Sequence, residues 1–333
     1  MRPRRQHCLP LRYLRPRRAP LSSANHRSLT PFQAPLPCRG TSSHRPTTVC
    51  PYLPPGPTSA VMDLLRAVVL GIVQGLTEFL PVSSSGHLIL IPALFNWPDQ
   101  GLTFDVGLHL GTLTALLVYF WRDWWNMARS ALADVARYGP KVKDHCQQSQ
   151  LLWLIALGSV PAGVAGLLLE NWVEENVRQP WLVAVMLACV GVVMLVADRR
   201  ARLERTVASV GVLDAVLIGL AQACALVPGV SRSGATITVG LMRGLTRGDA
   251  ARFAFLLGTP AFAGAALLKA PDLAEANGQL PELALGFATS ALVGLAAIHF
   301  LLRLLRTRDL VPFVVYRFAV AALALAIGAV RVA

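Results

Sequence analysis

The residues best suited to chemistry in this 333-residue sequence lie in two short segments. The first reads GIVQGLTEFLPVSSSGH and contains Gln74, Glu78, three consecutive serines and His87. The second reads PGVSRSGATI and places Arg232 between two serines. Carboxylate, hydroxyl and imidazole groups can activate a nucleophile, and a guanidinium can hold an oxyanion. The two segments together therefore indicate a site for an oxyanion, most simply a phosphate.

The first segment is predicted to be a broken helix. Gln74 and Glu78 are four residues apart, which places them on one helical face, and Pro81 follows soon after. A serine before a new helix can simply be an N-cap, but Ser83–Ser85 exceeds what one cap needs. Free N–H groups at a helix start, surrounded by hydroxyls, form a ready anion site.

Each of the other polar residues has a structural alternative. Glu78 could pair with a buried arginine or with backbone donors, although carboxylates inside membrane segments are rare and usually functional. His87 could be a packed, hydrogen-bonded histidine. Arg232 could be an interfacial arginine that extends to the water, but its glycine and serine neighbours favour close approach to a ligand. Its planar fork suits bidentate binding of phosphate oxygens.

The composition indicates an integral membrane protein. The chain is 54% hydrophobic and 15% charged, with a mean hydropathy of +0.51, whereas soluble domains carry about 25% charged residues. A membrane-spanning helix needs roughly 20 apolar residues. Two apolar stretches, around 63–96 and 211–242, are interrupted by polar, glycine and proline residues. Six others are candidate spans: 105–121, 150–168, 181–197, 249–268, 283–302 and 312–330.

The two segments belong to an internal repeat. Residues 71–87 align without a gap on 219–235, at an offset of 148 positions. Each copy is followed by three of the candidate spans. The six identities in this alignment are Gly71/Gly219, Gln74/Gln222, Val82/Val230, Ser83/Ser231, Ser85/Ser233 and Gly86/Gly234.

An odd number of spans in each repeat predicts that the second copy is inverted in the membrane, with its site near the midplane. Broken backbone at that depth is tolerated only where protein buries it or water reaches it. We therefore expect an all-α polytopic membrane protein with an inverted-topology repeat. Each half, about 62–198 and about 211–333, would hold one re-entrant helical hairpin and three transmembrane helices.

Charge separates an N-terminal segment from this membrane domain. Of the formal net charge of +13, the ten arginines of residues 1–61 account for +10, and that segment holds no acidic residue. It has no apolar periodicity and cannot bury a core. We expect a disordered extension upstream of a natural start at Met62. The rest of the chain predicts no nucleic-acid partner, and its scattered cysteines have no metal-ligand spacing.

Basic residues predict the orientation of the chain, because cytoplasmic loops are enriched in lysine and arginine. The opposite connections, 169–180 and 269–282, are richer in acidic residues. Both ends of the membrane domain would then lie outside the cytoplasm. The connections predicted to be cytoplasmic are 122–149, 198–210, 243–252 and 303–308.

The segments QGLTEFLPVSSSGHLIL and PGVSRSGATI resemble the two signature segments of the bacterial undecaprenyl-diphosphatase family of the bacitracin-resistance type. The resemblance covers essentially all of 62–333. It implies hydrolysis of undecaprenyl diphosphate to the monophosphate, which recycles the lipid carrier of cell-wall synthesis. It also implies the bacterial cytoplasmic membrane, with the site open to the periplasmic face. The family's acidic motif is written with Glu or Gln at the position of Gln74, so here the acidic role falls to Glu78.

The resemblance also implies roles for individual residues. Ser84 is the candidate nucleophile and His87 the candidate base or proton shuttle. Glu78 would orient His87 or hold a divalent cation, Mg or Ca, and Arg232 would clamp the diphosphate. Direct attack by water, with His87 as base, is the alternative to a phosphoserine intermediate. The expected substrate-binding residues are Gln74, Ser83, Ser85, Ser231, Ser233 and Gly234.

Inverted repeats with broken helices are also typical of transporters, so a transporter or flippase of a phosphorylated polyprenyl lipid is the alternative function. A transporter needs no activated nucleophile, and Ser84 beside His87 and Glu78 favours hydrolysis. The expected partners are a polyprenyl diphosphate lipid and the bilayer. Metal identity, prenyl length and homo-oligomer formation stay open at this point.

Overall fold

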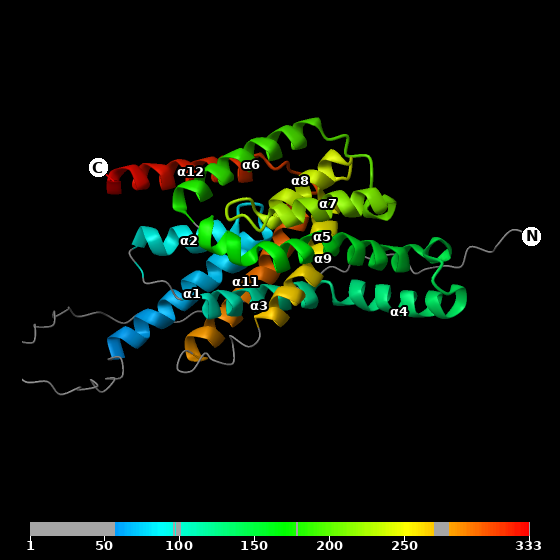
Figure 1. Ribbon diagram of the computed structural model, residues 1–333, viewed down its shortest axis with the longest axis horizontal. Helices are drawn as coiled ribbons and strands as arrows, with labels where there is room; N and C mark the ends of the chain where they lie inside the picture. The colour runs from blue at the N-terminus through cyan, green and yellow to red at the C-terminus, as the bar shows by residue number, and fades with distance from the viewer. Residues whose placement is uncertain (1–56, 96, 98–100, 178, 270–279, 333) are drawn as a thin grey trace, which may run out of the picture. The chain divides into compact units, whose positions relative to one another are not determined.

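The computed structural model describes residues 57–95, 97, 101–177, 179–269 and 280–332, and all regular secondary structure within them is helical (Figure 1). This confirms the all-α prediction. Of the expected extension, residues 1–56 lie outside the described part, and α1 begins five residues before Met62. The helices are α1 (Pro57–Phe79), α2 (Ser84–Phe95), α3 (Leu102–Tyr119), α4 (Trp121–Tyr138), α5 (Gln147–Asn176), α6 (Pro180–Arg200), α7 (Val212–Cys224), α8 (Arg232–Met242), α9 (Arg247–Leu268), α11 (Leu280–Leu304) and α12 (Val311–Val332), with short 3-10 turns at Val142–Asp144 and Val207–Ser209.

All six candidate spans coincide with helices, but they are not six uniform spans. In the described residues, α5, α6, α9 and α11 are long and apolar enough to cross a membrane. The pair α3 and α4 counts as a fifth span only if taken together, and it is bent by 67°. In α12, the residues whose side chains are described form a shorter apolar stretch, Val311–Ala326.

The two interrupted stretches are broken helices with matching backbone. The first break separates α1 from α2, and the second separates α7 from α8. Ser83 has a φ of 76° and Ser231 a φ of 75°, a region that is costly for residues other than glycine. The Oγ of each serine accepts a hydrogen bond from the N–H three residues on, Gly86 at 3.4 Å and Gly234 at 3.1 Å. The sequence repeat therefore extends to an unusual local conformation.

The first arm of each broken helix packs on a helix of the other half of the chain. Helix α1 lies along α11, and α7 lies along α5. Glycines permit this approach: a Cβ at Gly75 would lie 2.8 Å from the carbonyl oxygen of Ser290, and one at Gly219 would collide with the carbonyl of Gly158. Small residues let helix backbones come close in membranes, where tight packing drives association.

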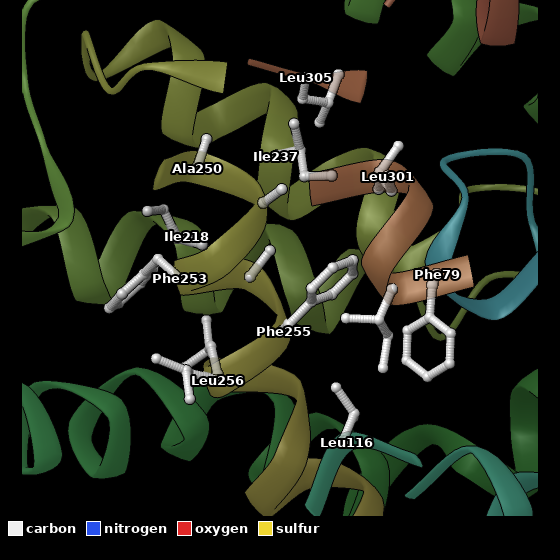
Figure 2. Packing of buried hydrophobic residues seen from close by; sticks show 14 of the residues in the cluster. Phe79, Leu116, Ile218, Ile237, Ala250, Phe253, Phe255, Leu256, Leu301 and Leu305 are labelled. Atoms are coloured by element: carbon white, nitrogen blue, oxygen red, sulfur yellow. The ribbon is translucent and has the colours of Figure 1, made fainter. Parts of the chain in front are cut away.

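A buried apolar cluster includes Phe79, at the end of α1, and residues of both halves of the chain (Figure 2). The ring of Phe79, at the end of α1, meets Phe255 of α9 edge-on, with 5.5 Å between ring centroids. Ile218 of α7, Ile237 of α8 and Leu301 of α11 belong to the same cluster. The breaks are thus supported by side chains from both halves of the chain.

The fully buried Arg317 of α12 connects the two breaks. Its Nη1 donates to the carbonyl of Pro81 at 3.2 Å in the first break. Its Nη2 donates to the carbonyls of Gly229 at 2.8 Å and Val230 at 3.3 Å in the second. Its Nε donates to the carbonyl of Leu187 in α6 at 3.0 Å. One guanidinium therefore satisfies carbonyls that the interruption of two helices leaves without helical partners.

The substitution Arg317→Met should destabilise the fold strongly, because it leaves several buried carbonyls without a donor. We expect a loss of at least about 3 kcal/mol, since hydrogen bonds to charged groups are worth roughly 1.5–3 kcal/mol each. Thermal unfolding of the detergent-purified protein measures this loss. Arg308→Met, at an exposed arginine beyond α11, is the control. Equal melting temperatures for the two variants would contradict the role of Arg317.

Candidate active site

Glu78 and Ser84 form the closest polar pair of the site. The Ser84 hydroxyl, at the first residue of α2, donates to Oε2 of Glu78 at 2.6 Å. Nε2 of Gln74, one turn earlier on α1, donates to the same oxygen at 2.8 Å. Both Gln74 and Glu78 are buried. The break in the helix thus folds the start of α2 back onto the end of α1 and aims a hydroxyl proton at a carboxylate.

His109 of α3 also faces Glu78. Its Nε2 lies 3.6 Å from Oε2 of Glu78, and its Nδ1 lies 2.7 Å from the carbonyl oxygen of Asp105. A carbonyl only accepts, so Nδ1 carries the proton and Nε2 is directed at the carboxylate. The sequence interpretation did not include His109. A histidine within an apolar span was the available signal.

Arg232 comes from the other half of the chain. It is the first residue of α8, whose N-cap is Ser231. Its guanidinium carbon lies 3.8 Å from the ring centroid of Phe262, a cation–π contact. Its Nη1 is buried without a hydrogen-bond partner in the described residues, and the next residue, Ser233, donates to the carbonyl of Leu80, two residues after Glu78. A positive donor without a partner, beside the Glu78–Ser84 pair, fits an anionic ligand.

Of the other serines, Ser233 joins the two breaks, and the rest lie close to a serine of their own break. Ser233 Oγ donates to the carbonyl of Leu80 at 3.1 Å, which joins the second break to the first. Ser231 Oγ and Ser233 Oγ are 3.3 Å apart, and Ser83 Oγ and Ser85 Oγ are 3.4 Å apart. Their expected role in binding phosphate therefore stays a prediction.

His87 does not adopt the arrangement expected from the sequence. Its Nδ1 lies 2.7 Å from the carbonyl oxygen of Ser83, and its Nε2 lies 2.8 Å from the hydroxyl of Tyr316 on α12. Because both ring nitrogens have these partners, His87 is turned toward α12. Ser84 instead donates to Glu78 directly. The hydrogen bonds of Glu78 join it to Ser84 and Gln74, and the expected roles of Glu78 and His87 in catalysis stay predictions.

His109 and Arg232 line a cavity of about 610 Å³. Its polar lining residues are Asp105, His109, Ser159, Gln222, Arg232 and Lys269, while most of the remaining wall is alanine, glycine and leucine from α5, from the turn after α7 and from α9. A Cβ added at Gly163 or Gly264 would meet no atom within 4 Å. The cavity is therefore a largely apolar space with a small number of polar groups in its wall, as expected for a ligand with an apolar body.

The residues around Glu78 can supply only part of a metal site. The described residues contain no group of three or more histidine, cysteine, aspartate or glutamate side chains that could hold a metal ion. Glu78 offers one carboxylate, and Oε1 of the buried Gln74 has no hydrogen-bond partner there. Mg²⁺ is commonly held by one or two carboxylates together with substrate phosphates. The donor set fits a cation that arrives with a phosphate ligand.

Residues 67–323 match the model of the family described as bacitracin resistance protein BacA. The chain belongs to this family. The match includes every residue of the site described above and the breaks of both interrupted helices. It confirms the resemblance that the two signature segments indicated.

Proteins named undecaprenyl-diphosphatase are similar along almost their whole length. The protein from Moorella thermoacetica is 46% identical over 266 residues, which cover 80% of this chain and 98% of the relative. The protein from Rubrobacter xylanophilus is 49% identical over 273 residues, covering 80% of this chain and 99% of the relative. That from Trichlorobacter lovleyi is 48% identical over 263 residues, covering 78% and 94%.

We expect Arg232→Lys to weaken binding of inorganic pyrophosphate about tenfold, because lysine keeps the charge but loses the bidentate fork. The Nη1 of Arg232, which has no hydrogen-bond partner in the described residues, is the group available to the anion. Isothermal titration of the detergent-purified protein measures the affinity. Arg252→Lys is the control, since Arg252 pairs with Asp123 away from the cavity. Unchanged pyrophosphate affinity in Arg232→Lys would remove Arg232 from the anion site.

Proposed function

We propose that this protein is an integral membrane phosphatase that hydrolyses undecaprenyl diphosphate to undecaprenyl phosphate and phosphate. The observation that carries the proposal is the Ser84–Glu78 hydrogen bond of 2.6 Å next to the unpartnered Nη1 of Arg232, beside a largely apolar cavity. A hydroxyl with a proton acceptor, a fixed positive charge and room for a hydrocarbon chain are what the reaction needs. The names of the relatives support the same activity.

In the proposed mechanism the Ser84 Oγ attacks the terminal phosphorus while Glu78 takes the hydroxyl proton. The bond to the bridging oxygen breaks, and the polyprenyl phosphate leaves with that electron pair. The leaving polyprenyl phosphate takes up the proton from Glu78, which returns to its carboxylate form. Glu78 then accepts a proton from the water that attacks the phosphoserine; the bond between phosphorus and Ser84 Oγ breaks, that proton passes to Oγ, and phosphate is released. Arg232 stabilises the charge that develops on the transferred group. Direct attack by water, with Ser84 only positioning the phosphate, is the alternative.

A divalent cation, Mg or Ca, would be held by Glu78 and Gln74 together with phosphate oxygens of the substrate. When bound, it would neutralise part of the diphosphate charge. The residues of this chain orient the substrate whether or not the cation is present. Arg232 binds the diphosphate, and the apolar cavity wall contacts the first isoprene units.

The two halves of the chain are proposed to lie inverted in the bacterial cytoplasmic membrane, with the site open to the periplasmic face. The matched φ angles at Ser83 and Ser231 support a structural repeat, and the three candidate spans that follow each broken hairpin in the sequence support the inversion. Hydrolysis there would return the lipid carrier to peptidoglycan synthesis. Removal of the diphosphate form would give bacitracin resistance, as the family description indicates.

Ser84→Ala should abolish phosphate release from undecaprenyl diphosphate, because no other hydroxyl in the described residues donates to Glu78. The loss should be at least about a hundredfold, the scale on which positioned acid–base groups contribute. Phosphate release by purified wild type and variant, with Mg or Ca present, measures it. If wild type releases no phosphate, transport of a phosphorylated lipid, which the paired broken helices also suit, becomes the better function. Trapping of a phosphoserine would separate covalent from direct attack.

Filling the cavity should weaken binding of the lipid substrate. Gly264→Leu adds a side chain into open space on α9, so we expect the KM for undecaprenyl diphosphate to rise about tenfold with little change in melting temperature. Removing room for a few methylenes costs on the order of 1.4 kcal/mol, which is tenfold. Gly248→Leu is the matched control, because Gly248 also has open surroundings on α9 but does not line the cavity. Equal KM values for the two variants would place the lipid elsewhere.

A further inference from the structure

Gln222 of α7 carries a buried side-chain amide. It is 3% exposed and lines the cavity. Neither Nε2 nor Oε1 of its side chain has a hydrogen-bond partner in the described residues. Buried polar side chains are normally hydrogen-bonded, and an exception calls for an explanation such as a bound group. Gln222 therefore has two N–H donors and one acceptor available to a ligand.

The internal repeat explains why this amide lacks a partner. Gln222 is the counterpart of Gln74 at the offset of 148 residues. In the first half, Nε2 of Gln74 donates to Glu78 four residues later. In the second half, the residue four positions after the glutamine is Leu226, which has no polar group. Both Leu226 and Gln222 line the cavity.

The surroundings of Gln222 define the ligand chemistry. Arg232, whose Nη1 also has no partner in the described residues, lines the same cavity. Two side chains thus offer N–H donors to one space, so an acceptor-rich anion such as a phosphate suits them. The apolar cavity wall adds a preference for a phosphate that carries hydrocarbon.

The position of Gln222 indicates which phosphate it meets. Ser84 and Glu78 are not part of the cavity wall, whereas Gln222 and Arg232 are. We infer that Gln222 binds the phosphate that remains on the lipid, while Arg232 lies between it and the transferred phosphate near Ser84. Gln222 is then a positioning residue that sets how far the diphosphate reaches toward Ser84. This inference rests on the proposed function for the identity of the lipid.

The test compares Gln222→Leu with wild type for direct binding of undecaprenyl phosphate and of inorganic phosphate. We expect the affinity for undecaprenyl phosphate to fall about tenfold, as for the loss of one hydrogen bond to a charged group. The affinity for inorganic phosphate, which binds next to Ser84, should change less than about twofold. In turnover, the KM for undecaprenyl diphosphate should rise by a similar factor. Loss of inorganic phosphate binding alone, or no change in either affinity, would overturn the inference.

Stability distinguishes this role from a structural one. The side chain of Gln222 makes no hydrogen bond in the described residues. Gln222→Leu therefore removes no hydrogen bond of the fold and should keep or raise the melting temperature. A fall of several degrees would mean that the amide has a partner in the fold, and the inference would fail. Gln150→Leu is the matched control: its amide donates to the carbonyl of His145 at 2.9 Å, so this variant should lose stability but keep both affinities.

Failure of the inference and failure of the proposed function give different results. Binding of undecaprenyl phosphate needs no turnover. If wild type binds this lipid more tightly than Gln222→Leu but releases no phosphate from the diphosphate, the inference holds and the phosphatase proposal fails. If wild type releases phosphate and both proteins bind the lipid equally, the phosphatase proposal holds and the role of Gln222 is wrong.

Discussion

The hydrogen bonds of Arg317 are the constraint on which the site depends. A helix that stops inside a membrane leaves carbonyls without partners, and no bulk water is present there to satisfy them. Arg317 donates to Pro81 in one break and to Gly229 and Val230 in the other. The same side chain that satisfies these carbonyls also fixes the two breaks relative to each other. Ser84 and Arg232 start the helices that follow, so their separation is set by this guanidinium.

Much of the site could be predicted from residue types and local spacing. Gln74, Glu78 and Ser84 do come together, because the i to i+4 geometry of a helix aligns the first two and the break returns the third. Arg232 reaches the same place from the second segment, as the internal repeat suggested. The positions of the breaks also followed from proline and serine within apolar stretches. These features are local, so the sequence contains the information for them.

The remaining features depend on contacts between distant segments. Nothing near His87 in the sequence indicates that the hydroxyl of Tyr316 will lie 2.8 Å from its Nε2. His109 and Arg317 looked like single polar residues in apolar spans, and only the packing of α3 on α1 and of α12 on the breaks gives them partners. The 67° bend between α3 and α4, at the end of the expected span 105–121, was likewise not predicted. Tertiary packing decided all of these.

The differences between the two halves matter as much as their similarity. Residues 84 and 232 are counterparts, and so are Glu78 and Leu226. Two identical hairpins meeting at one point would place two carboxylates, or two guanidinium groups, within a few ångströms, and like charges at that distance disfavour each other's ionised forms. One half instead supplies the carboxylate and the hydroxyl, while the other supplies the cation and an amide without a partner. The repeat thus provides the geometry, and the loss of symmetry at a few positions provides complementary charges for a diphosphate.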